Sequence, residues 1–218
     1  YHFGRIHTIF LQNLISHFPN IQQYIIPIEK YEKGQIERCD ASIYLGTYYN
    51  NNIPSAFSED YIATKKQVLW AGYNIWKLEP KVLSELLGVH FRGLSNLDWD
   101  HLDENGHPTF FRHFDYLGER FTKYGEFLSS DRKKYIAAFE IVLLDLISSP
   151  NNHVEVLSWA EHTATHERVP YVLRQQNHWY IADSPFSFAT EKDRYLIMSD
   201  ILFDILNEKP RYTGKKPA

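Results

Sequence analysis

One stretch of the sequence, residues 67–87, limits the possible folds of this chain more than any other. Residues 67–71 form a short, uncharged and mostly apolar run, which is typical of a strand that is buried on both faces. Gly72 follows where such a strand has to turn sharply, and glycine adopts positive φ angles at little cost. Apolar residues then recur at helical spacing as far as Leu87. The stretch therefore predicts a buried strand that turns over a glycine into a helix, which is a building unit of α/β folds.

The rest of the first half repeats this alternation. Residues 5–18 carry apolar side chains at helical spacing, and residues 41–45 form a second buried run. Pro54 suits the first turn of a helix over residues 54–64. Helices and strands that alternate along a chain favour parallel strands joined by right-handed crossovers. We therefore expect an α/β fold with a mostly parallel sheet that is flanked by helices.

The second half of the sequence has a different character. Asn105-Gly106 and Leu117-Gly118 are turn signals between β-rich runs, which indicates antiparallel hairpins. We predict an antiparallel β-rich insertion over about residues 105–175, after which a strand and a helix return to the sheet. Residues 1–208 then form a single domain. Residues 209–218 are basic and contain proline and glycine, as expected of a linker to a following domain.

The composition argues against several classes of function. The chain has 218 residues and a net charge of −4, so we expect no nucleic-acid binding. A single cysteine, Cys39, excludes an internal disulfide and a cysteine-based metal cluster. No apolar run approaches the length of a membrane span, so we predict no membrane-spanning segment. The 15 tyrosines and 14 phenylalanines suit either an aromatic core or a surface that meets neutral polar ligands such as sugars.

Four segments of the chain resemble the region that precedes the catalytic domain in a group of polysaccharide-deacetylase-like proteins. They are HTIFLQNLISHFP, ASIYLGTYYNN, VLWAGYNIWKL and WYIADSPFSFATEKDRYLIMSDILFDIL, of which the GYNIW, ADSPFS and DRYL stretches are the most specific. The resemblance covers almost the whole chain. It implies a flavodoxin-like fold, similar to that of class I glutamine amidotransferases, followed by a deacetylase domain. Such a fold has a strand ahead of its first helix, and the sequence shows none there, so the expected sheet is one strand short.

The same resemblance implies further expectations about cofactors, partners and location. A divalent metal would belong to the following deacetylase domain, and this segment would need no cofactor. Its partners would be its own downstream catalytic domain and a polysaccharide. The usual substrates of the family imply an extracytoplasmic location, either periplasmic or secreted.

Catalysis of the amidotransferase kind is not expected. Proteins of that kind carry a cysteine at the turn after the strand that corresponds to residues 67–71, and here Gly72 or Tyr73 occupies this place. The last expected strand, at residues 179–183, is followed by no histidine. A triad that lacks its nucleophile retains only residual catalysis. We therefore expect a domain without catalytic residues.

Two pairs of residues remain as alternatives. Glu161 and Asp183 end neighbouring strand candidates, and paired carboxylates are the usual device of glycosidases, so a self-sufficient carbohydrate-active hydrolase stays open. His162 and His166 are four residues apart, and two imidazoles can hold a metal ion when a third ligand joins them. They lie in a polar loop between two expected strands, where solvated histidines are the commoner interpretation.

The carboxyl ends of the expected parallel strands offer a binding site. Open α/β sheets bind ligands at this edge, and the strand ends at Gly46, Gly72 and Asp183 should lie side by side. Amide, hydroxyl and aromatic groups follow these ends, and together they suit a neutral polyol. The candidate ligand-binding residues are Thr47, Tyr48, Asn50, Tyr73, Asn74, Ser184 and Phe186. Alternatively, these side chains only satisfy the loop backbone and cover the ends of the sheet.

The sequence thus predicts a non-catalytic N-terminal module of a polysaccharide deacetylase. Its role would be structural, glycan-presenting or both, and a hydrolase that uses a carboxylate pair is the alternative.

Overall fold

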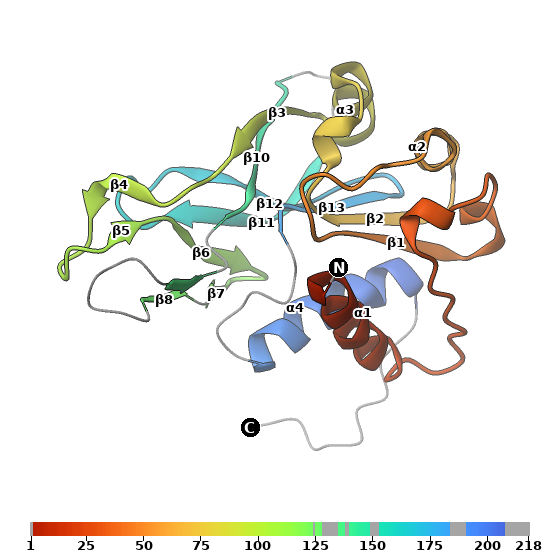
Figure 1. Ribbon diagram of the computed structural model, residues 1–218, viewed down its shortest axis with the longest axis horizontal. Helices are drawn as coiled ribbons and strands as arrows, with labels where there is room; N and C mark the ends of the chain where they lie inside the picture. The colour runs from red at the N-terminus through yellow and green to blue at the C-terminus, as the bar shows by residue number, and fades with distance from the viewer. Residues whose placement is uncertain are drawn as a thin grey trace.

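The computed structural model describes residues 2–123, 125–127, 135–137, 140–148, 153–183 and 191–207. Its centre is a seven-stranded sheet with the strand order β1-β2-β13-β12-β11-β6-β7 (Figure 1). The strands of this sheet are β1 (Ala41–Gly46), β2 (Gln67–Gly72), β6 (Phe111–Tyr116), β7 (Glu119–Thr122), β11 (Glu155–His162), β12 (Arg168–Gln175) and β13 (His178–Ile181). Smaller two-stranded sheets pair β3 (Val89–Leu94) with β10 (Val142–Leu146), β4 (Asp98–Leu102) with β5 (Pro108–Thr109), and β8 (Gly125–Phe127) with β9 (Tyr135–Ala137).

Helices cover both faces of the parallel end of this sheet. They are α1 (His2–Ile15), α2 (Ser55–Ala63), α3 (Pro80–Leu87) and α4 (Glu191–Leu206), and short 3₁₀ turns η1 (Ile28–Lys30), η2 (Ile36–Arg38) and η3 (Ile75–Lys77) lie between them. In Figure 1, α1 and α4 lie below the sheet, and α2 and α3 lie above it. None of the described helices combines the length and the apolarity that crossing a membrane requires.

The sheet is mixed, and this corrects the expectation that it is mostly parallel. Parallel pairing joins β2 to β1 on one side and to β13 on the other. The pairs from β13 through β12, β11 and β6 to β7 are all antiparallel. The α/β class and the antiparallel portion in the second half are confirmed. The local cause is turn chemistry, because Leu117 and Gly118 both adopt left-handed φ angles, 50° and 83°, as a tight hairpin between β6 and β7 requires.

The core of the parallel end is aromatic. Trp70 on β2 is fully buried, and its ring meets Tyr44 of β1 at 4.6 Å and Tyr61 of α2 at 5.3 Å, both edge to face. The indole N–H of Trp70 donates to the backbone carbonyl of Tyr73 at 2.8 Å, so the buried ring carries no unsatisfied donor. The core therefore reaches to the turn after β2 and fixes its backbone.

The chain after β2 forms two short helices where the apolar spacing predicts one. Pro80 lacks an N–H and starts α3 instead of continuing a helix from η3. Gly88 ends α3 with a left-handed φ of 63°. The broken helix leaves the residues between Gly72 and Leu78 as a compact turn at the edge of the sheet.

Candidate functional site

The carboxyl ends of the three parallel strands meet at one edge of the sheet, as the sequence predicts. Gly46 at the end of β1 pairs with Gly72 at the end of β2, and Ala71 pairs with Ile181 near the end of β13. The N–H of Tyr73 donates to the carbonyl of Gly46 at 2.8 Å. Gly72 has a φ of 84°, so the predicted glycine turn is confirmed.

The loop after β1 is fixed from beneath by a buried asparagine. Asn74 is fully buried, and its side-chain N–H groups donate to the carbonyl of Tyr48 at 2.7 Å and to the hydroxyl of Tyr44 at 3.3 Å. The amide of Asn51 donates to the same hydroxyl at 3.3 Å, and Lys77 donates to the carbonyl of Asn51. The loop backbone is therefore held by the side chains of Asn74 and Lys77, while Tyr48 is 60% exposed.

Two tyrosines and a glutamate form the inner rim of this loop. The rings of Tyr49 and Tyr73 lie 4.6 Å apart at an angle of 37°. The hydroxyl of Tyr49 donates to the carboxylate of Glu140 at 2.6 Å. Burial raises the pKa of Glu140, against the hydrogen bonds from both tyrosine hydroxyls and the charge of Lys123. Burial and the hydrogen bond to Glu140 raise the pKa of Tyr49 to about 12, so the phenol keeps its proton and acts as a donor.

A buried ion pair lies next to this rim. Lys123 follows β7, and its side chain has no exposed surface. Its ammonium pairs with the carboxylate of Asp183 and donates to the backbone carbonyl of Glu140 at 3.1 Å. Burial lowers the pKa of Lys123, and the charge of Asp183 opposes this shift. A buried charge of either sign is costly alone, so the attraction between the two groups offsets part of that cost.

Sequence reasoning missed Lys123 and Glu140. The alternation of β7 contains a signal for the lysine, because Phe121 is buried and a period of two puts Lys123 on the same inward face. Glu140 lies just before β10, outside any regular element, so no periodicity indicates its direction.

The predicted ligand-binding residues fall into three groups. Thr47, Tyr48 and Asn50 lie on the loop after β1, and Tyr48 and Asn50 are exposed. Tyr73 is half-buried beneath Tyr49, and Asn74 is buried and holds the loop. Binding by these residues stays a prediction. Ser184 and Phe186 lie outside the described residues.

Glu161 and Asp183, the alternative catalytic pair, are not brought together. Strand β12 lies between β11, which carries Glu161, and β13, which precedes Asp183. The carboxylate of Glu161 accepts from Arg120 at 2.9 Å and lies 3.2 Å from a ring nitrogen of His166. Asp183 pairs with Lys123 instead. The carboxylate that shares a neighbourhood with Asp183 is Glu140, whose pKa is raised in part by the charge of Asp183.

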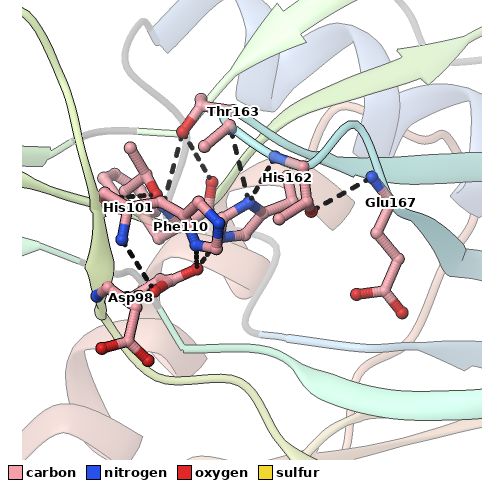
Figure 2. Close-up of polar contacts among 10 residues, drawn as sticks. Asp98, His101, Phe110, His162, Thr163 and Glu167 are labelled. Atoms are coloured by element: carbon pink, nitrogen blue, oxygen red, sulfur yellow. Dashed lines mark hydrogen bonds and ion pairs between the residues drawn. The ribbon is translucent and has the colours of Figure 1, made fainter.

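His162 and His166, the alternative metal ligands, face different partners. Nδ1 of His162 accepts from the N–H groups of Ala164 and Thr165 at 3.4 and 3.2 Å, and its Nε2 lies 3.6 Å from Asp98. Figure 2 shows this buried ring within the polar contacts of the turn after β11. His166 is exposed and lies beside Glu161. Among the described residues, no group of three or more histidine, cysteine or acidic side chains is arranged to hold a metal ion.

The turn after β11 should make the stability of the protein dependent on pH. Burial lowers the pKa of His162 below 6.5, against the charge of Asp98. The unfolded chain takes up this proton near pH 6.5, whereas the folded chain resists it because burial disfavours the charged ring. We therefore expect the free energy of unfolding to fall as the pH falls through 6.5 and below.

Denaturation with urea at about pH 7.5 and about pH 5.5 measures this dependence. His162→Gln should reduce the difference between the two conditions, and His166→Gln, at an exposed position, should leave it as in the wild type. Equal differences in all three proteins would contradict this role of His162.

Comparisons with known proteins assign no family to this chain. No family model matches the chain, and no curated protein matches it. A solved structure that is similar is alpha-L-fucosidase isoenzyme 2 from Paenibacillus thiaminolyticus, with 14% sequence identity and a TM-score of 0.42. The similarity covers 79% of this chain and 24% of the fucosidase chain, so the present chain spans about a quarter of that protein's length.

Proposed function

We propose that this chain is a non-catalytic module that binds a neutral polyhydroxyl ligand, such as part of a polysaccharide, on the loop after β1. One observation carries the proposal. Tyr48 is 60% exposed, yet its backbone carbonyl accepts a hydrogen bond from the fully buried Asn74. An exposed aromatic group on a fixed backbone loses little conformational freedom when it binds, so its contacts contribute more to affinity.

The chemistry of the loop suits an uncharged ligand with many hydroxyls. Tyr48 offers a ring face for the apolar side of a sugar, and Asn50 offers an amide that both donates and accepts. Glu140 adds carboxylate oxygens at the inner rim, where Tyr49 already donates to them. The ammonium of Lys123 is fully buried and paired, so it is not presented to a ligand at this edge. These groups favour hydrogen bonding and stacking over the recognition of an anion.

The proposed role follows from the resemblance to polysaccharide-deacetylase-like proteins. In this role the module presents a glycan to a catalytic domain further along the same protein, which would be an extracytoplasmic deacetylase with its own divalent metal. The buried Lys123–Asp183 pair is then a structural support for the rim. A flavodoxin-like fold of the parallel end belongs to the same proposal.

A carbohydrate-active hydrolase is the second candidate, and one observation favours it. Glu140 and Asp183 are carboxyl groups in contrasting surroundings, because burial raises the pKa of Glu140 while Asp183 is paired with Lys123. Such a contrast is found where one carboxyl donates a proton and another stays ionised. Asp183 is only 5% exposed, however, which leaves it little contact with a substrate.

Binding to the loop should depend on Tyr48. We expect Tyr48→Ala to weaken the affinity for neutral oligosaccharides by about 1–3 kcal/mol, the scale of one aromatic contact in a binding site. The melting temperature should change little because the ring is mostly exposed. Tyr73→Ala should lower both the affinity and the melting temperature, since its ring packs on Tyr49 and Trp76. Calorimetric titration with a panel of sugars, run beside thermal melts, gives both quantities.

The matched control is Tyr24→Ala, because Tyr24 is 65% exposed and lies in the segment between α1 and η1. This variant should bind as the wild type does. Absence of heat for every sugar, together with a lowered melting temperature of Tyr73→Ala, would leave these residues with a structural role alone.

The isolated chain should not turn over carbohydrate. We expect no release of acetate from acetylated chitooligosaccharides and no new reducing ends, with or without Zn²⁺ or Co²⁺. Reducing ends that disappear in Glu140→Gln would establish the hydrolase instead. Metal-dependent release of acetate that disappears when His162 and His166 are replaced would overturn the non-catalytic assignment.

A further inference from the structure

A row of aromatic rings leads away from the loop after β1. The ring of Tyr49 on this loop lies 4.6 Å from that of Tyr73, in the turn after β2. The ring of Tyr73 lies 6.1 Å from that of Trp76 in η3. Trp76 in turn lies 5.3 Å from Phe91 on β3. The row, defined by these four residues, therefore joins the proposed binding loop to a strand outside the central sheet.

The row is accessible to a ligand. Tyr49 is 39% exposed and Phe91 is 37% exposed, whereas the two rings between them are half-buried. The angles between successive ring planes are 37°, 55° and 32°, so no ring is stacked flat on the next. Contiguous apolar surface that stays exposed in this way often belongs to a ligand-binding groove.

The backbone beneath the row is fixed by hydrogen bonds and by burial. The N–H of Tyr73 donates to the end of β1, and its carbonyl accepts from the indole of Trp70, both at 2.8 Å. Trp76 directly follows Ile75, which is fully buried. Phe91 lies in the antiparallel pair of β3 with β10. Rings on such a backbone lose little conformational freedom on binding, so each ring that a ligand reaches can add to the affinity.

The groups beside the row favour a neutral ligand with a repeating structure. The carboxylate of Glu140 lies at the Tyr49 end, and the exposed Lys77 follows Trp76 in η3, so neither sign of charge dominates. A sugar unit combines an apolar face, which suits an aromatic ring, with hydroxyls that form hydrogen bonds. A single unit covers only part of the row, whereas a linear chain of units can meet its rings in succession.

We infer that the ligand is a linear neutral oligosaccharide that extends along the row from the loop after β1 to Phe91. This inference rests on the proposed function and adds Trp76 and Phe91 to its binding residues. Short sugars bind at Tyr48 and Asn50 on the loop, and the further units of longer chains gain contacts with the row. The affinity therefore rises with chain length until Phe91 is covered.

Calorimetric titration with N-acetylated chitooligosaccharides and with cello-oligosaccharides, from the monosaccharide to the hexasaccharide, tests the inference. In at least one series, the hexasaccharide should bind at least about tenfold more tightly than the disaccharide. Phe91→Ala should weaken binding of that hexasaccharide at least about fivefold and leave the disaccharide unaffected. Phe91→Tyr keeps the ring and should bind both sugars as the wild type does. Trp99→Ala is the matched control, because Trp99 is 51% exposed on β4 and lies outside the row.

The outcomes distinguish this inference from the proposed function. Equal affinities of the wild type for the disaccharide and the hexasaccharide would overturn the inference and leave binding on the loop intact. A hexasaccharide affinity that Phe91→Ala does not change would do the same. Absence of binding by every member of both series would overturn the inference together with the proposed function. The length series of the wild type decides the question if Phe91→Ala fails to fold.

Discussion

Lys123→Met should lower the free energy of unfolding by about 3–5 kcal/mol, the cost that is typical when one partner of a buried ion pair is removed. The ammonium of Lys123 is the cation paired with Asp183, which is only 5% exposed. Methionine fills much of the same volume but leaves the carboxylate of Asp183 without this countercharge in an apolar environment. The variant also removes the hydrogen bond to the carbonyl of Glu140. Urea denaturation followed by circular dichroism measures the change.

Two controls separate the buried charge from other effects. In the double variant Lys123→Met with Asp183→Asn, both charges are absent, so a large part of the lost stability should return. Lys33 and Glu59 form a pair at 2.6 Å whose side chains are 69% and 56% exposed. Lys33→Met should therefore change the stability far less than Lys123→Met does, because water solvates the remaining charge. Equal losses of stability in Lys33→Met and Lys123→Met would show that the buried ion pair contributes no more to the free energy of unfolding than the exposed pair does.

The sequence predicts those parts of the fold that depend on local chemistry. The uncharged run at residues 67–71 predicts a buried strand and Leu117-Gly118 predicts a hairpin, and both predictions depend only on neighbouring residues. The position of β11 beside β6 is different, because strands that pair at Phe114 and Ala160 are far apart in sequence. The partner of a strand is chosen by tertiary packing, which no local period records. For this reason the α/β class was predictable, whereas the mixed order of the sheet was not.

The same distinction applies to the candidate site. Parallel strands bring Gly46, Gly72 and Asp183 to one edge by geometry alone, so this juxtaposition could be predicted. The separation of Glu161 from Asp183 could not be predicted, because it depends on β12, which lies between their strands and sets each carboxylate against a different cation. Glu140 joins the site from an irregular connection, and its carboxylate accepts a hydrogen bond from Tyr49. The spacing of residues in the sequence therefore predicts which strand ends share an edge of the sheet, but it does not predict that the charged groups of Lys123, Asp183 and Glu140 lie close together at that edge.

Gly72→Ala should destabilise the protein by about 2–5 kcal/mol, as the sum of two separate costs. The first is conformational, because Gly72 has a φ of 84°, and a side chain in the left-handed region costs about 1–2 kcal/mol. The second is steric, because a Cβ at this position would lie 2.5 Å from the carbonyl oxygen of Gly46, and such overpacking costs about 1–3 kcal/mol. That carbonyl accepts the N–H of Tyr73, so it cannot move without losing a hydrogen bond at the candidate site. Gly118→Ala isolates the first cost, since Gly118 has a φ of 83° and an added Cβ would meet nothing within 4 Å. Guanidinium denaturation of the wild type and both variants gives the two differences. If Gly72→Ala costs no more than Gly118→Ala, the close approach of β1 and β2 at this edge is not a constraint on the fold.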